Sequence, residues 1–490
     1  MLTPMLSSRL TLALAAALVS ACSSLPPSSA PIPTDSPSAE ARDCVAWMTR
    51  LDETVAQADV ADAQEARVAG QPHLRTNRFT AALAQDARVD DASFARDGLT
   101  AMRALDRAAR SAEISNLPAL ALLALQTSRT EALQRSETCA TLLMATAKPA
   151  RNTFAVASNY STGKRFFGAY ALTRYPFTAG VERQFSAVRM AFARPLEVPA
   201  GGKLLRYVPL ELPMDTVDDA LLLNQHQPVF ETEVTLPDDE IGALAWDTAQ
   251  RRPVVQTSQP AVYTAITYTR YRGQTLRQLV YTVWFGARPA DGPGDLLAGH
   301  LDGLIWRVTL DRDNKVLLYD TIHPCGCYHY FITTPSAQAM AAPPNEPEWA
   351  FVPQTVAAPQ TSERVVLRIA TRTHYLERVT LEPRVAQASA TVQQVPTVVL
   401  PQDALRALPQ LTAGKPDPTL ATHSAFGPDA LVPETQRGER FIFWPMGIVS
   451  PGQPRQWGHH ATAFVGERHF DDAHLLERRF ELLTAPMLAR

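Results

Sequence analysis

The chain changes character at Lys148-Pro149, and this change limits the possible folds more than any other feature. Residues 40–147 are rich in Ala, Leu, Arg and Glu, with almost no proline, whereas strand-like runs separated by proline-rich loops follow. Helical spacing before the change and hairpin spacing after it predict an α+β fold, in which an N-terminal helical bundle precedes a β-rich antiparallel sheet or sandwich. We therefore expect a helical domain over 40–147 and a β-rich domain over 148–490.

The helical region shows one clear amphipathic face. Cys44, Trp47, Met48 and Leu51 stand at i, i+3, i+4 and i+7, which predicts a helix with a buried stripe. Two further helices are expected over 91–112 and 117–146. The run 120–125 is apolar on every side, which predicts that the last of these helices is central to the bundle.

The β-rich region contains several runs with the alternation and residue types of strands. Two hairpins are predicted, one from 261–270 and 276–285 around the turn 271–275, the other from 304–310 and 316–319. The other expected strands are 203–209, 328–334, 364–370 and 441–444. The proline-rich segments 335–362 and 385–437 are expected to be long loops, and the chain holds 39 prolines in all.

The N-terminus has the organisation of an export signal. Arg9 precedes an apolar run from Leu10 to Val19, which is shorter than the roughly 20 residues that a membrane-spanning helix needs. The following Leu18-Val19-Ser20-Ala21-Cys22 resembles the lipobox of bacterial lipoproteins. That resemblance implies removal of residues 1–21, acylation at Cys22 and, because Ser23 rather than aspartate follows, an outer-membrane location. An ordinary secretory signal cut after Ala21 is the alternative.

Residues 22–39 and the overall charge are consistent with a lipid-anchored protein of the cell envelope. Residues 23–38 are rich in Ser and Pro, which is typical of a tether that forms no core. The formal net charge of -3 gives no general attraction to nucleic acid, so the expected partners are the membrane, through the acyl chains, and an envelope protein or glycan. In such an oxidising compartment Cys44 and Cys139 are expected to form a disulfide, with buried free thiols as the alternative.

The densest group of chemically versatile residues is His323-Pro-Cys325-Gly-Cys327-Tyr-His329. Its proline and glycine, between two strand-like runs, predict a tight turn at a hairpin tip. One interpretation is a zinc or copper site formed by His323, Cys325, Cys327 and His329 and completed by His459. A second is thiol-redox chemistry, because Cys-Gly-Cys can close a small, strained disulfide. The third is a structural turn with hydrogen-bonded histidines.

A second group lies just upstream, at His300 and Asp302. Their i, i+2 spacing places both on one side of a strand, as a carboxylate-oriented histidine requires, although Asp302-Gly303 is also a simple turn signal. Asp320 is a further candidate partner of His323. The catalytic candidates are therefore His300, Asp302, Cys325 and Cys327.

The chain lacks a Gly-x-Ser-x-Gly elbow, a P-loop, a dinucleotide fingerprint and a His-Glu-x-x-His motif. The main hypothesis is a lipid-anchored envelope protein with a binding or structural role. The alternative is a periplasmic metal-dependent hydrolase or thiol-redox enzyme centred on the turn 323–329. The sequence leaves open whether the protein is an enzyme.

Overall fold

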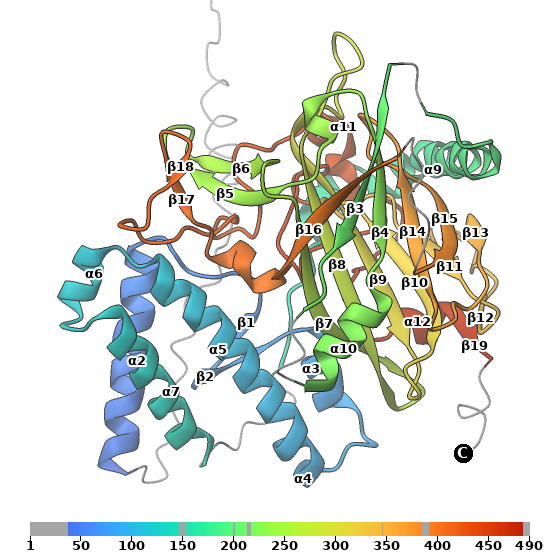
Figure 1. The fold of residues 1–490 in the computed structure, drawn as a ribbon. Coiled ribbons are helices and arrows are strands. Elements are labelled where there is room, and N and C mark those ends of the chain that lie inside the picture. Colours follow the sequence, from blue (N-terminus) through green and yellow to red (C-terminus); the bar gives the residue numbers. More distant parts are fainter. Residues whose placement is uncertain are drawn as a thin grey trace, which may run out of the picture.

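The protein combines a helical N-terminal region with one large mixed sheet (Figure 1). The computed structural model describes residues 38–145, 147, 151, 154–198, 201–212, 217–344, 346–384 and 392–483. The signal segment, Cys22 and most of the tether lie outside these residues. No helix in the described ranges combines the length and apolarity needed to cross a membrane.

The N-terminal region places helices around a short hairpin. Its elements are α2 (Ala39–Gln57), β1 (Ala66–Val68), β2 (Gln71–Thr76), α3 (Arg78–Gln85), α4 (Asp91–Ser93), a π-helical turn (Phe94–Gly98), α5 (Leu99–Asn116), α6 (Ala119–Ala124) and α7 (Arg129–Met144). The predicted face of α2 is buried against α7, and Cys44 and Cys139 are joined by a disulfide. The hairpin β1–β2 packs between these helices, so the region is not made of helices alone.

The single helix expected over 117–146 is divided into α6 and α7. Gln126 has a φ of 53°, and Ser128 begins α7 with a capping box to Glu131, so two local signals end one helix and start the next. The expectation that the run 120–125 is central is wrong. Leu120 and Leu123 are 81% and 70% exposed, because only Leu122 of α6 is buried, with Ala121 packed beside it against the core.

The main sheet has eleven strands in the order β13-β11-β10-β9-β8-β7-β16-β3-β4-β14-β15. The strands are β3 (Lys203–Pro209), β4 (Val229–Val234), β7 (Ala261–Tyr271), β8 (Gln274–Arg288), β9 (Gly299–Leu310), β10 (Val316–Ile322), β11 (Tyr330–Thr333), β13 (Gln354–Thr355), β14 (Glu363–Ile369), β15 (Leu376–Pro383) and β16 (Gln393–Pro401). Both predicted hairpins are present, as β7–β8 and β9–β10. The sheet is mixed rather than purely antiparallel, because β16 runs parallel to both β3 and β7.

The remaining strands form two small sheets. One contains β5 (Ala243–Asp247), β6 (Arg252–Gln256), β17 (Gln410–Thr412) and β18 (Lys415–Pro416), and the other contains β12 (Ala337–Ala339) and β19 (Phe480–Leu482). The main core lies on one face of the large sheet and includes Tyr281, Trp306 and Leu367.

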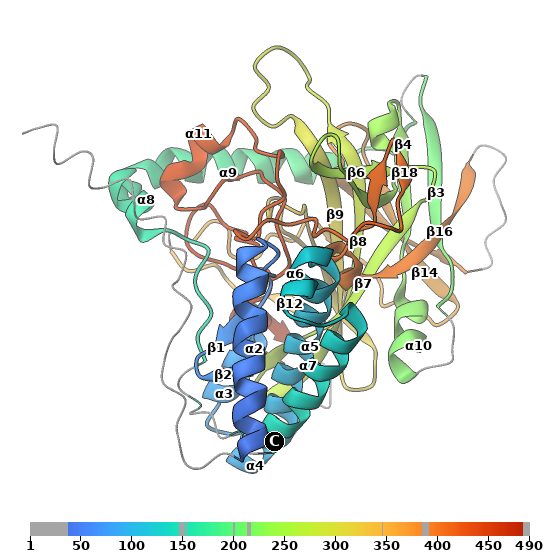
Figure 2. The same cartoon turned by 90° about the vertical axis from the view of Figure 1, so that its left-hand side faces the viewer.

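Among the described residues, the β-rich region is accompanied by α8 (Thr162–Phe167), α9 (Tyr170–Ala193), α10 (Val217–His226), α12 (Leu475–Arg479) and a further short helix, α11 (Arg440–Phe443). The expected strand 441–444 is instead helix α11, followed by a 3-10 turn (Trp444–Met446). Figure 2 shows α11 beside α8 and the long helix α9. The loops that follow α11 then cover the ends of β9 and β10, where the candidate site lies.

Candidate functional site at the Cys-Gly-Cys turn

Residues 323–329 form a tight turn between β10 and β11. The amide of Gly326 donates to the carbonyl of His323 at 2.8 Å, and the amide of His323 donates to the carbonyl of Cys327 at 3.0 Å. Gly326 has a φ of +91°, and a Cβ built on it would lie 2.4 Å from the carbonyl oxygen of Ala461. The turn therefore requires glycine for its conformation and for its contact with the 461 loop.

One end of the turn is fixed by a buried ion pair. The guanidinium of Arg307 on β9 makes a bidentate ion pair with the carboxylate of Asp320 on β10, with N–O distances of 2.9 and 2.6 Å. Nε2 of His329 lies 2.9 Å from the same carboxylate. Burial would raise the pKa of Asp320, but Arg307 and His329 lower it. Burial lowers the pKa of His329 to about 3, so its imidazole is neutral and donates to Asp320.

The other end is fixed by a second carboxylate. Asp302 on β9 lies 3.1 Å from Nδ1 of His323 and 2.9 Å from Nδ1 of His374, and Nε2 of His374 lies 3.4 Å from Asp239. Burial works against the charge on Asp302, yet His323, with His374, holds its pKa well below the usual range. Burial lowers the pKa of His374, but the two carboxylates outweigh it and raise that pKa.

Three residues beside these two anchors have strained backbone conformations. Leu301, Tyr328 and His374 all adopt the left-handed region, with φ of 54°, 59° and 52°. Each is costly for a residue with a bulky side chain and persists only where the surroundings enforce it. Of the three, His374 is held by Asp302, whereas Leu301 and Tyr328 are the chain neighbours of Asp302 and His329.

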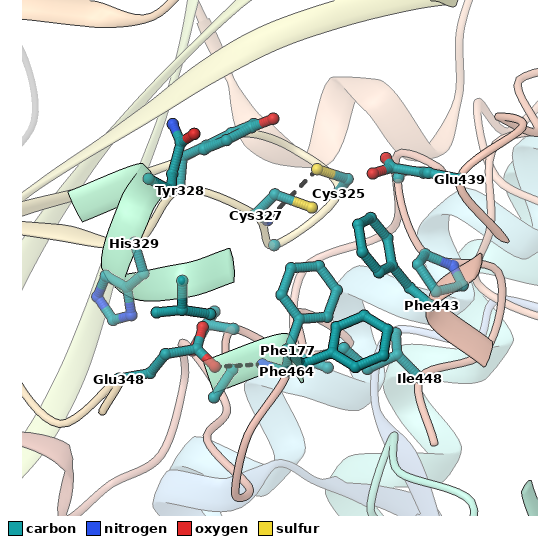
Figure 3. Close-up of a pocket in the computed structure, with 18 of the residues that line it drawn as sticks. Phe177, Cys325, Cys327, Tyr328, His329, Glu348, Glu439, Phe443, Ile448 and Phe464 are labelled. Carbon is teal, nitrogen blue, oxygen red and sulfur yellow. Dashed lines mark hydrogen bonds between the residues drawn. The ribbon is translucent and has the colours of Figure 1, made fainter. Parts of the chain in front are cut away.

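The two thiols line a cavity of about 260 Å³ (Figure 3). Its apolar wall comes from α9, α11 and the following loops: Phe177, Val181, Phe185, Phe443, Ile448 and Phe464. Cys325, Cys327 and Glu439 lie on the polar side of the cavity, which also includes His329 and Glu348, and Figure 3 shows the Glu439 carboxylate beside Cys325. The cavity therefore suits an apolar or aromatic group presented to a pair of thiols.

The thiols differ in environment. The amide of Cys327 donates to Sγ of Cys325 at 3.3 Å, and both cysteines are free and half-buried. The hydrogen bond to Cys325 and burial raise the pKa of Cys327 well above its usual value. Cys327 therefore stays a protonated thiol that donates to its neighbour.

Two charged side chains act on this pair. Burial raises the pKa of Glu439 to about 7, against the opposing charges of Arg437 and Arg288. Arg455 is buried, and its guanidinium donates to the carbonyls of Val449 and Ser450 at 3.0 Å; it forms no ion pair with a carboxylate among the described residues. Burial lowers the pKa of Arg455, and the two cysteines are the main groups opposing that shift.

The other predicted residues lie elsewhere. Nε2 of His300 lies 2.7 Å from the carbonyl of Pro253, whereas His323 is held by Asp302. Nε2 of His459 lies 2.7 Å from the carbonyl of Ala63 and its Nδ1 contacts Asn159. Asp320 contacts His329 rather than His323.

Within the described ranges, no cluster of three or more His, Cys, Asp or Glu side chains has a geometry suited to a metal ion. Both turn histidines are instead held by carboxylates, His323 by Asp302 and His329 by Asp320. The zinc or copper site of His323, Cys325, Cys327, His329 and His459 stays a prediction.

Sequence reasoning missed Arg455, Glu439 and the aromatic wall. Arg455 stands near the histidine pair 459–460, so the local clustering of polar residues was a usable signal. Phe443 belongs to the segment 441–444 predicted as a strand, Glu439 lies just before that segment, and nothing local indicates that either residue faces the turn at 323–329. Asp239 and His374 are likewise brought to Asp302 only by the fold.

Comparisons with known proteins add no relative: no family model, curated protein or solved structure matches the chain.

Proposed function

We propose that the protein is a thiol–disulfide exchange protein of the cell envelope, whose reactive group is the Cys325–Cys327 dithiol. The observation that carries this proposal is the placement of two free thiols on one tight turn, where they line an apolar cavity and the amide of Cys327 donates to Sγ of Cys325. Beside this turn, the amide of the buried Arg455 donates to the carbonyl of Pro324 at 2.9 Å, and its guanidinium forms no ion pair within 4 Å among the described residues. A cation beside a cysteine favours the thiolate, which is the nucleophile in disulfide exchange. The apolar cavity would hold an aromatic or aliphatic part of the substrate next to the sulfur atoms.

The environments of the two thiols suggest different roles. Cys325 accepts hydrogen bonds from the amide of Cys327 and from its thiol, which suits a sulfur that carries negative charge. Its thiolate would attack one sulfur of a substrate disulfide, forming a mixed disulfide and releasing the other substrate sulfur as a thiolate. Cys327 would then lose its proton to Glu439 and attack the sulfur of Cys325, which closes the Cys325–Cys327 disulfide and releases the second substrate thiol.

The same steps in reverse would transfer a disulfide from the protein to a substrate dithiol. A disulfide between residues separated by one glycine closes a small ring, and strained disulfides are stronger oxidants than structural ones. The direction that we favour is therefore oxidation of a substrate dithiol, with each turnover leaving Cys325 and Cys327 reduced.

The proposal includes attachment to the outer membrane through an acylated Cys22. It is supported by the lipobox-like Leu18–Cys22, by the Ser/Pro-rich tether and by the Cys44–Cys139 disulfide, which is typical of an oxidising compartment. Cys22→Ser should leave the chain unprocessed or release it from the membrane fraction. Unchanged fractionation and migration of this variant would contradict the anchor.

The dithiol is tested by redox titration of the full chain in glutathione buffers, followed by alkylation and peptide mapping. We expect the Cys325–Cys327 disulfide to form reversibly at a potential above roughly -300 mV, the upper limit of structural disulfides, while Cys44–Cys139 stays oxidised. A dithiol that never closes, or that closes only with loss of the folded state, would contradict the proposal.

The roles of the two thiols are separated by dithiobis(nitrobenzoate), an aromatic disulfide. Cys327→Ser should accumulate a mixed disulfide at Cys325, whereas Cys325→Ser should lose the fast reaction. Glu439→Gln should slow closure of the intramolecular disulfide without slowing the first attack. Equal reactivity of both cysteines, matching that of the unfolded chain, would show that the pocket does not activate either one.

A binding role is the second candidate, and the aromatic cavity favours it. In that case a double serine variant at 325 and 327 would keep its affinity for apolar ligands.

A further inference from the structure

Two apolar segments far apart in the sequence lie against each other beside the cavity. Residues 161–181 contain α8 and the first half of α9, and residues 440–454 contain α11 and the 3-10 turn. The amide of Ser161 donates to the carbonyl of Gly447 at 2.8 Å, and the rings of Phe177 and Phe443 are 5.4 Å apart. Figure 2 shows α8, α9 and α11 gathered at one end of the molecule.

Together these segments expose an unusual amount of apolar surface, which we call the aromatic patch. Its eight members are Phe166, Phe167, Leu172, Tyr175, Phe441, Ile442, Trp444 and Val449. Among the described residues, every phenylalanine with a largely exposed side chain belongs to it, and Phe166 is 79% exposed. Exposed apolar groups scattered singly are normal, but a group of this size on adjoining elements indicates an interaction surface.

The two segments of the patch are basic. Residues 161–181 and 440–454 contain four basic residues and no acidic residue, although Glu182 and Glu439 flank these ranges and Arg165 is paired with Glu467 at 2.7 Å. Arg174 lies over the ring of Tyr175 and Arg440 over that of Phe441, and neither forms an ion pair with another described residue. Basic groups set among exposed aromatic side chains are typical of surfaces that lie at a membrane–water interface.

We propose that the aromatic patch docks on the surface of a lipid bilayer that carries anionic headgroups. Its phenylalanine, leucine and isoleucine side chains would enter the boundary of the acyl region, with Trp444 and Tyr175 at headgroup level. Arg174 and Arg440 would contact phosphate groups, because basic side chains near an anionic membrane surface strengthen binding to it. This docking depends neither on the thiols nor on acylation of Cys22.

The charges disfavour a second copy of the chain as the occupant. In a two-fold dimer the same surface faces itself, so Arg174 and Arg440 of each chain would oppose like charges across the contact. The phosphate groups of an anionic bilayer, by contrast, can pair with both Arg174 and Arg440.

The docked orientation has a consequence for the cavity. Phe177 and Phe443 line the cavity, and they belong to the same helices as the exposed members of the patch. Docking would therefore bring the Cys325–Cys327 pair close to the bilayer surface, where apolar substrates concentrate.

The test uses residues 23–490, which lack both the apolar signal segment and the acyl attachment point in every sample. Vesicles of phosphatidylglycerol and phosphatidylcholine with brominated acyl chains quench tryptophan fluorescence on contact. We expect these vesicles to quench part of the tryptophan fluorescence of the unsubstituted protein. This quenching should be absent in Trp444→Phe, because Trp444 is the tryptophan that belongs to the aromatic patch. The double variant Arg174→Glu with Arg440→Glu should bind the vesicles more than about tenfold more weakly. Added salt should weaken vesicle binding of the protein without these substitutions in the same way.

The matched control is Leu120→Ser with Leu123→Ser, which removes two exposed apolar side chains from α6 in the helical region. It should leave vesicle binding unchanged. Binding that leaves Trp444 unquenched, or that the α6 control weakens as much as the arginine variant, would overturn the proposal. A concentration-dependent dimer that the arginine substitutions alter, without vesicle binding, would assign the patch to a second copy instead.

Discussion

Nε2 of His329 lies 2.9 Å from Oδ2 of Asp320, with both side chains fully buried at the base of the Cys-Gly-Cys turn. Asp320 also holds Arg307, whose guanidinium lies 3.7 Å from the centre of the Phe470 ring and donates to the Phe470 carbonyl at 2.6 Å. One carboxylate thus joins β9, β10, the turn and a C-terminal loop.

Asp320→Asn should destabilise the protein severely, because it leaves Arg307 buried without its counter-charge. Removing one partner of a buried ion pair costs roughly 3–5 kcal/mol. The measurement is urea unfolding at neutral pH. Asp313→Asn, at an exposed position in the β9–β10 turn, is the control and should change stability by less than about 0.5 kcal/mol. Similar effects of the two substitutions would show that the ion pair contributes little.

The His329 imidazole should make the fold sensitive to acid. Its pKa is about 3 in the folded protein, because the imidazole is buried, against 6.5 for an exposed histidine, so the unfolded chain binds more protons between these pH values. Stability is therefore present above pH 6.5 and is lost as the pH falls through this window. His329→Gln keeps an N–H donor for Asp320 and should reduce the slope of the unfolding free energy against pH. The reduction should correspond to at most one proton taken up on unfolding. Identical slopes for the variant and the wild type would contradict this assignment.

The local features of this site were predictable from the sequence, but its partners were not. Proline, glycine and two flanking strand-like runs placed residues 323–329 at a hairpin tip, and the two neighbouring hairpins followed from alternation. The carboxylate for each histidine depends on strand register: Asp320 stands opposite Phe331, so His329 rather than His323 reaches it. Arg455 and Glu439 approach the thiols from segments more than 100 residues away in the sequence.

The missed helix α9 has a different cause. Its sequence from Tyr170 to Ala193 contains Pro176 and many aromatic residues, and only Val181, Val188 and Phe192 are buried. Neither helix propensity nor a continuous apolar stripe marks such a segment. The parallel pairing of β16 was equally hidden, because it joins strands that are distant in the chain.

The Cys44–Cys139 disulfide should contribute strongly to the helical region. It closes a loop with a sequence separation of 95 residues. In the chain-entropy description, a loop of this length stabilises the fold by roughly 4–5 kcal/mol. Replacing both cysteines with alanine should lower the free energy of unfolding by about this amount in urea titrations. A loss no larger than that of an ordinary surface substitution would show that the helices hold together without the crosslink.

Gly326→Ala should disrupt the Cys-Gly-Cys turn because Gly326 has a positive φ and because an added Cβ would collide with the 461 loop. Gly466 has only the first of these features, so the same substitution there serves as the control. Gly326 and Gly466 have similar positive φ values, +91° and +95°. A Cβ added to Gly326 would lie 2.4 Å from the carbonyl oxygen of Ala461, whereas a Cβ added to Gly466 would have no atom within 4 Å. Gly466→Ala should therefore cost only the roughly 1–2 kcal/mol of left-handed backbone. Gly326→Ala should cost more and should also alter the alkylation rates of Cys325 and Cys327, because the 461 loop must move away from the thiols. Equal losses of stability in the two variants, with unchanged thiol reactivity, would show that the turn tolerates this movement and that the close packing at Gly326 does not set the geometry of the thiol pair.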